Sequence, residues 1–168
     1  PINDASANEG TAITEVATLE HDLGLGQDNS LVQVDADTYA LAYTGVDGDG
    51  FISTFDIAAD GTTITEVATL EHDTDNGTFN SLVQVDSDTY ALAYAGTGQD
   101  GFISTFTISS SGVITAVRTQ SLGNNLEHDT AQGKYNSLVQ VDADTYALAY
   151  AADASDGYIS TFDIAADG

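Results

Sequence analysis

Ile13-Thr-Glu-Val-Ala-Thr-Leu-Glu-His-Asp22 is the stretch that decides the fold, because the same ten residues recur without change from Ile64 to Asp73. A variant starts at Ile114 and regains Leu126-Glu-His-Asp129 after a six-residue insertion. Repetition of this kind is typical of architectures built from stacked units. The sequence therefore predicts one continuous repeat domain with units at residues 11–61, 62–112 and 113–168, preceded by a leader segment of residues 1–10.

Each unit reads as four β-strands separated by turns. In the second unit the strands are expected at residues 81–85, 89–94, 102–108 and 113–117, with Asp-, Ser- and Gly-rich turns between them. The strand at residues 89–94 alternates strictly, with Tyr90, Leu92 and Tyr94 on one face and Ala91 and Ala93 on the other. Both faces are largely apolar, which predicts a sheet packed on both sides.

Four strands in a period of about 50 residues indicate β-propeller blades, which stack face to face. The chain resembles propeller repeats of the WD40 and kelch kind in strand order and loop placement, although it has neither the Trp-Asp pair of the first nor the Gly-Gly pair of the second. We therefore expect an all-β fold of tandem four-stranded antiparallel blades. A β-solenoid and a string of small β-sandwiches are the alternatives.

The open ends of the array predict how the chain is completed. The strand expected at residues 11–19 reads as the outer strand of a blade whose other strands are absent, and the third unit ends where its own outer strand would begin. Three units are fewer than the four to eight blades of a closed propeller, and long free edges are normally covered. We expect pairing between copies, in a ring or a filament, or continuation in a longer array. The strands concerned carry Ile13, Val16, Leu19, Phe162 and Ile164.

A recurring His, Asp and Thr in each unit predict a structural loop network. The resemblance to WD40 blades implies that the His is held by the Asp and that the Thr is the third member of a buried hydrogen-bonded set. The three sets are His21, Asp49 and Thr54; His72, Asp100 and Thr105; and His128, Asp156 and Thr161. A metal site at the Glu-His-Asp triplets, or solvent exposure of the His residues, is the alternative.

Two further features are candidate binding sites. Asp47 and Asp49 offer alternate carboxylates in a Gly-rich loop, which suits calcium, although the spacing departs from the EF-hand pattern. Phe79 and Tyr135 occupy matching loop positions, where Asp28 stands in the first unit. An aromatic ring beside carboxylates and amides suits stacking on a sugar, and it equally suits packing at a blade edge.

Composition limits the partners. The 27 Asp and Glu against 2 Lys and Arg give a net charge of −25, which opposes binding to nucleic acid and to anionic lipid. No apolar run is long enough to insert in a membrane. The chain starts with Pro1 and contains no Met, which predicts a processed form or a piece of a longer protein. The acidic composition favours an extracellular or cell-surface location.

The sequence thus predicts an extracellular structural or adhesive repeat protein whose partner is a further copy of itself. A glycan-binding, lectin-like propeller with one site per blade is the alternative. Enzymatic activity is not expected, because three His residues in equivalent positions single out no asymmetric catalytic site. No cofactor other than calcium is indicated.

Overall fold

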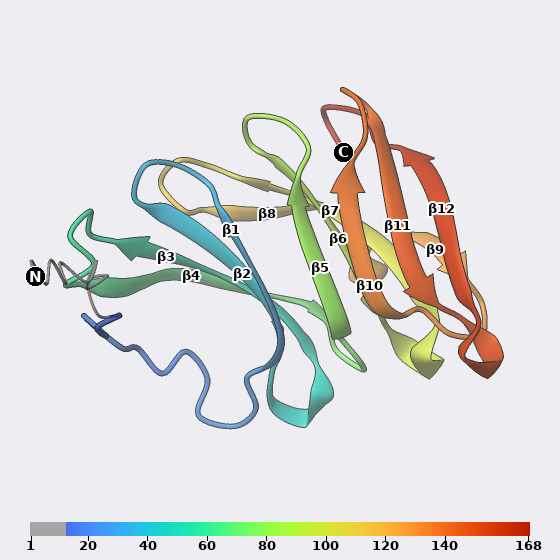
Figure 1. Cartoon of the computed structure of the whole chain (residues 1–168), viewed down its shortest axis with the longest axis horizontal. Coiled ribbons are helices and arrows are strands. Elements are labelled where there is room, and N and C mark those ends of the chain that lie inside the picture. Colours follow the sequence, from blue (N-terminus) through green and yellow to red (C-terminus); the bar gives the residue numbers. More distant parts are fainter. Residues whose placement is uncertain (1–12) are drawn as a thin grey trace, which may run out of the picture.

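A computed structural model gives the fold and describes residues 13–168. Its strands form three antiparallel sheets that follow one another along the chain and fan out side by side (Figure 1). The predicted leader, residues 1–10, lies outside the described residues, as do residues 11 and 12 of the first expected strand.

The first two sheets have the four-stranded pattern, and the third has three strands. The first sheet runs in the order β1 (Gln27–Gln33), β2 (Thr38–Thr44), β3 (Gly50–Ile57) and β4 (Ile64–Asp73). The second contains β5 (Thr78–Gln84), β6 (Thr89–Ala95), β7 (Gly101–Ile108) and β8 (Ile114–Arg118), and the short β9 (Leu126–Asp129) continues its outer edge along β7. The third contains β10 (Lys134–Gln140), β11 (Thr145–Ala151) and β12 (Gly157–Asp163).

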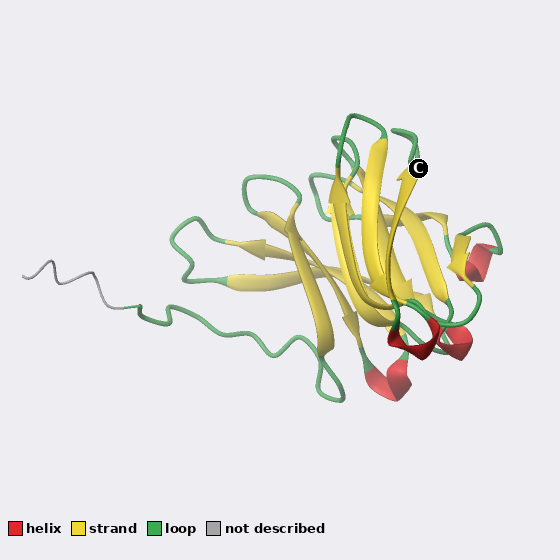
Figure 2. Ribbon diagram, turned by 45° about the vertical axis from the view of Figure 1, so that its right-hand side comes forward, coloured by secondary structure: helices red, strands yellow, loops and turns green. Residues whose placement is uncertain are grey.

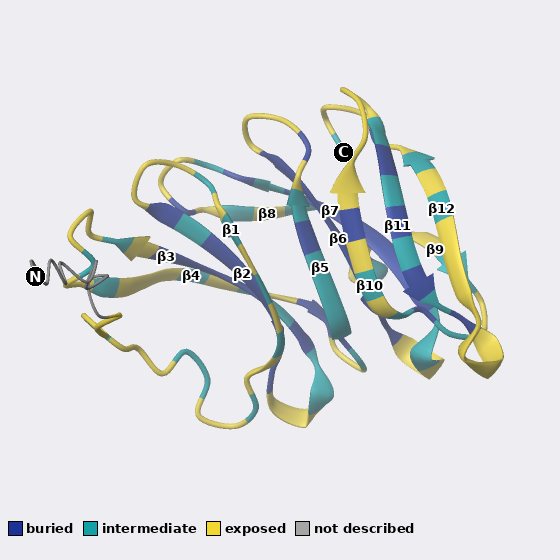
Figure 3. Cartoon of the chain, in the orientation of Figure 1, coloured by how far each residue is buried: buried dark blue, intermediate teal, exposed yellow. Residues whose placement is uncertain are grey.

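The sheets stack with a bulky face against a small face, as the alternation in the sequence predicts. Between the first two sheets, Ala40 and Ala42 pack against Tyr90, Leu92 and Tyr94. The same arrangement recurs between the second and third sheets, where the small face of β6 meets the Tyr-Leu-Tyr face of β11. The central strand β6 is consequently buried along its whole length (Figure 3).

Each loop between the second and third strands of a sheet contains one turn of 3-10 helix: η1 (Val46–Gly48), η2 (Thr97–Gln99) and η4 (Asp153–Ser155). A fourth turn, η3 (Gln120–Leu122), lies in the insertion between β8 and β9. Figure 2 shows that these short turns lie at the ends of long strands. Among residues 13–168 no helix has the length and apolar character needed to cross a membrane.

The three sheets are β-propeller blades. Their first strands, β1, β5 and β10, lie next to one another, and the later strands of each blade follow in antiparallel order towards the outside of the fan. The predicted all-β fold of tandem antiparallel blades is therefore confirmed. The third blade ends at β12, and the fan does not close on itself (Figure 1).

Candidate assembly site

A tightly packed His joins each blade to the next. His72 is fully buried, and its ring meets Tyr94 edge-on at 4.7 Å between centroids and Phe106 at 5.9 Å. A Cβ atom placed on Gly50 would lie 2.5 Å from His72 Cε1, so only glycine fits there. The backbone of Gly77 closes the contact by donating to the carbonyl of Gly48 at 2.9 Å.

The predicted hydrogen-bonded network of His, Asp and Thr is wrong. Both ring nitrogens of His72 and of His128 are buried without a hydrogen-bond partner. The Thr members also differ from the expectation: Thr54 Oγ1 donates to the Gly112 carbonyl at 2.7 Å, Thr105 Oγ1 is buried and unpaired, and Thr161 is exposed. No hydrogen bond in the described structure links His21, His72 or His128 to Asp49, Asp100 or Asp156.

His72 and His128 instead act as packed, neutral rings. The imidazole of His72 lies among aromatic rings and glycine backbone, and this burial lowers its pKa to about 3. Burial also lowers the pKa of His128 to about 4, with the nearby Asp129 charge opposing the shift. Both rings are therefore uncharged at neutral pH, which is compatible with their apolar surroundings.

The Asp of each Leu-Glu-His-Asp motif shapes the turn that follows. Asp73 Oδ1 accepts hydrogen bonds from the backbone N–H groups of Asp75 at 3.0 Å and Asn76 at 3.2 Å. Asp22 accepts in the same way from Gly24 at 2.6 Å and Leu25 at 2.9 Å. The turn of the first motif is therefore formed although residues 13–19 belong to none of the three sheets.

Residues 13–22 are positioned like the outer strand of a blade, although residues 13–168 contain no other strand of that blade. His21 packs edge-on against Tyr43 at 4.7 Å, as His72 does against Tyr94. Val16 lies at the turn glycine Gly61, 3.8 Å from the place of its Cβ atom, as Val67 lies at Gly112.

The expected strand at residues 11–19 is nevertheless absent from the described part, residues 13–19. The identical residues 64–70 form β4 because they pair with β3, whereas residues 13–19 belong to none of the three sheets. Ile13, Val16 and Leu19 are exposed.

The matching vacancy lies at the other end of the fan. Within residues 13–168, β12 pairs with β11 alone, while its counterpart β3 pairs with both β2 and β4. Ile159 in β12 is 79% exposed, whereas the equivalent Ile52 and Ile103 are 0% and 5% exposed. A Cβ atom on Gly157 would meet nothing within 4 Å, although the equivalent Gly50 is packed against a His ring.

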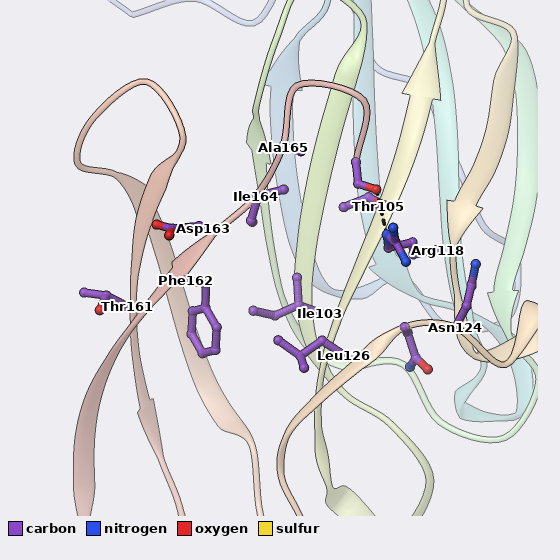
Figure 4. A pocket seen from close by; sticks show the side chains of 12 residues that line it. Ile103, Thr105, Arg118, Asn124, Leu126, Thr161, Phe162, Asp163, Ile164 and Ala165 are labelled. Atoms are coloured by element: carbon purple, nitrogen blue, oxygen red, sulfur yellow. Dashed lines mark hydrogen bonds between the residues drawn. The ribbon is translucent and has the colours of Figure 1, made fainter.

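A groove of about 620 Å³ runs along this free edge (Figure 4). Ile103 and Leu126 of the second blade line one side, and Phe162 and Ile164 of the third blade line the other. Between the first two blades the corresponding space is filled, because Ile114 and Ala116 of β8 pack against the core there. The groove is therefore the space that an outer strand of the third blade would occupy.

The first blade has an open face of its own. Leu31 in β1 is 57% exposed, whereas the equivalent Leu82 and Leu138 are 6% and 5% exposed. In the second blade the N–H of Leu82 donates to Ser30 Oγ at 2.9 Å, and in the third Leu138 donates to Ser81 Oγ at the same distance. Leu31 thus presents the surface that its counterparts bury against a preceding blade.

The structure brings the two candidate sugar-stacking residues, Phe79 and Tyr135, into contact. The rings of Phe79 and Tyr135 lie 4.7 Å apart at the start of adjacent strands, and Tyr135 is 71% exposed. Both residues have positive φ, as has Asp28 in the first blade, because each stands where the register of the inner strand shifts.

Asp47 and Asp49 lie in the loop of the first blade, as predicted, with Asp47 at φ 61°. Across residues 13–168 there is no group of three His, Asp or Glu side chains close enough to hold a metal ion. Calcium binding at these two residues stays a prediction.

Sequence reasoning did not single out Leu31, Gly157 or Ile159. The signal was present in the repeats, because Leu31 aligns with Leu82 and Leu138, and Gly157 and Ile159 align with Gly50 and Ile52. Only the stacking direction of the blades shows which member of each set lacks a neighbour.

Comparison with solved structures gives a likeness to larger proteins. A periplasmic gluconolactonase of Pseudomonas aeruginosa matches over 79% of this chain with a TM-score of 0.58 and 14% sequence identity. The likeness is one of fold. An α-L-arabinofuranosidase from Lactobacillus brevis matches over 83% of this chain with a TM-score of 0.46 and 9% identity. The chain spans 38% of the first structure and 49% of the second.

No protein-family model matches the sequence, and no curated protein matches it. The resemblance to propeller repeats therefore holds at the level of blade architecture, through the fold shared with the gluconolactonase. Membership of the WD40 or kelch families gains no support from these comparisons.

Proposed function

We propose that the chain is a self-assembling structural module of an extracellular or cell-surface protein, in which blades are completed by strands from outside the chain. Residues 13–22 of one copy would add to the free edge of β12 in another copy, or the next repeat of a longer array would do so. Addition of a strand to an exposed sheet edge is a common mode of recognition, because the main-chain hydrogen bonds are already aligned.

One observation carries the proposal. The ten residues that form β4 along β3 occur a second time, at residues 13–22, without forming a strand in the described structure, while β12 repeats the β3 sequence with a free edge. The only difference between residues 50–57 and residues 157–164 is Tyr158 in place of Phe51. The two sequences that pair within the first blade thus occur again at the two ends of the fan, where they do not form a common sheet.

Apolar surface adds to the argument. Ile13, Leu31 and Ile159 are each more than half exposed, and their counterparts in paired blades are partly or fully buried. Burying a side chain of this size contributes about 1.5–3 kcal/mol. Three such residues at each junction would favour association even though both surfaces are acidic.

The proposal assigns the chain a structural rather than a catalytic role. Its three His residues lie in equivalent positions and pack against aromatic rings. Aromatic rings contact all three, and the ring nitrogens of His72 and His128 have no hydrogen-bond partner. These surroundings suit a role in blade packing.

A labelled peptide of residues 11–22 tests the proposal directly. The peptide should bind a chain that lacks residues 1–19, because that variant keeps the β12 edge and has no strand of its own to offer. A peptide of the same composition in scrambled order is the control. Equal binding of both peptides, or binding of neither, would contradict the proposal.

Glycan binding is a second candidate, favoured by the contact between Phe79 and Tyr135. Two adjoining rings on neighbouring blades, one of them largely exposed, offer a platform on which a sugar could stack. A glycan array would test this candidate. Signals lost in the Phe79→Ala and Tyr135→Ala variants would support it, and an array without signal for the unmodified chain would contradict it.

A further inference from the structure

We propose that the platform formed by Phe79 and Tyr135 binds a sugar ring that carries a protonated amino group, as in an oligomer of glucosamine. This inference rests on the glycan-binding candidate above and names its ligand class. It is independent of strand addition between copies, because the two rings belong to blades that already pack on each other.

The three inner strands differ at the position that forms the platform. Asp28, Phe79 and Tyr135 each stand directly before the same seven residues, Asn-Ser-Leu-Val-Gln-Val-Asp. All three have positive φ, at 50°, 55° and 54°. Asp tolerates this left-handed conformation, whereas a bulky side chain rarely adopts it. Backbone strain of this kind clusters at functional sites, so two aromatic rings held in this conformation indicate a ligand site.

The platform is formed before any ligand binds. Asn136, the residue after Tyr135, ties the third blade to the second, because its Nδ2 donates to the Phe79 carbonyl at 3.1 Å. The same Nδ2 donates to the Gly133 carbonyl at 2.8 Å, which closes the turn before Tyr135. The two rings are therefore fixed side by side, and a fixed platform lowers the ordering cost of binding.

A carboxylate lies at the Phe79 end of the platform. Thr44 Oγ1 is within hydrogen-bond distance of Asp28 Oδ2, at 3.3 Å, and of the Gly77 carbonyl, at 2.7 Å. Asp28 therefore lies beside the segment that leads into Phe79. The row across the three inner strands is a carboxylate followed by two aromatic rings.

This row suits a cationic sugar. A sugar ring stacks on aromatic rings, and an ammonium group is attracted both to the face of such a ring and to a carboxylate. The net charge of −25 opposes uronic acids and sulfated glycans and attracts cations. Lys134 directly precedes Tyr135, so the amino group belongs at the other end of the row, near Asp28 and Phe79.

Calorimetric titration with a glucosamine tetramer tests the proposal. Mildly acidic buffer keeps the amines protonated, and about 0.15 M salt screens exposed charges that lie more than about 8 Å apart. The N-acetylglucosamine tetramer is the matched probe, because acetylation removes the charge and keeps the ring. The glucosamine tetramer should bind about fivefold more tightly. Equal or tighter binding of the acetylated probe would overturn the amino group and keep glycan binding, and binding of neither would overturn both.

Variants separate the platform from general charge attraction. Phe79→Ala and Tyr135→Ala should each weaken binding of the glucosamine tetramer about fivefold, and Asp28→Asn should remove the preference over the acetylated probe. Asp142→Asn is the control and should bind normally, because Asp142 is an exposed carboxylate beyond the opposite end of β10. Unchanged binding by the double variant of Phe79 and Tyr135 would overturn the proposal. Weaker binding by Lys134→Gln would overturn the orientation of the ligand.

Discussion

At the scale of single residues, the junction between blades depends on the match between a His ring and a glycine. The repeats of the sequence predict that His21, His72 and His128 have one common structural role, and this holds for their packing. They do not predict the missing hydrogen bonds, because a motif gives no information on which groups surround a ring. Three-dimensional stacking places Tyr94 and Phe106 around His72 and leaves its nitrogens without partners.

The buried rings predict instability in acid. The pKa of His72 is about 3 in the folded chain and 6.5 as a free side chain. The unfolded chain therefore binds more protons between these values, and stability falls as the pH drops from 6.5 towards 3. Each pKa unit corresponds to about 1.4 kcal/mol. His72→Leu should therefore move the midpoint of acid unfolding, followed by circular dichroism, to a lower pH. An unchanged midpoint would contradict this assignment.

Two glycines at equivalent positions should respond differently to substitution. Gly101→Ala should lower stability by about 1–3 kcal/mol, because the added Cβ would collide with the His128 ring. Gly157→Ala should leave the single chain as stable as before, since its surroundings are open, and should weaken association. Thermal unfolding of a dilute sample and sedimentation of a concentrated one separate the two effects. Normal association of Gly157→Ala would argue against an occupied site at this position.

At the scale of strands, one sequence adopts two structures. Residues 64–73 form β4 and residues 13–22 do not, although they are identical. The apolar alternation and turn residues allowed the strands of each blade to be predicted, because these signals are local. Whether a strand forms at residues 13–22 depends on an edge to pair with, and that edge is not local.

Proline substitutions exploit this identity. Adjacent N–H groups of a strand point to opposite sides, so prolines at two neighbouring positions remove at least one hydrogen bond to any partner. Ala17→Pro with Thr18→Pro should abolish association and leave the fold of the single chain intact. Ala68→Pro with Thr69→Pro, the same change in β4, should destabilise the fold itself. If the first variant associates as the unmodified chain does, the donated strand is not residues 13–19.

At the scale of the whole molecule, charge opposes association. Each copy carries a net charge of −25, so two copies repel each other. Inside the first blade, desolvation and contact with Asp49 raise the pKa of Glu71, and Glu20 would meet Asp156 in the same way across the junction. The Debye length shortens from about 10 Å at 0.1 M salt to about 3 Å at 1 M.

Association should therefore strengthen as salt is added. Sedimentation equilibrium over this range of ionic strength would measure the change. A dissociation constant that rises with salt would mean that ion pairs, rather than apolar contacts and strand pairing, hold the copies together.

The repeat predicts the unit, and the alternating face sizes predict how units stack. The missing neighbours become visible only when equivalent residues in the three blades are compared for burial, as for Leu31 with Leu82 and Ile159 with Ile52.

The molar mass of the unmodified chain in solution is the most direct test of this account. Light scattering at micromolar concentration should give a mass above that of one chain, because the free edge of β12 in one copy accepts residues 13–22 of another. A stable mass of one chain under the same conditions would contradict it, because residues 13–22 and the edge of β12 would then not associate between copies.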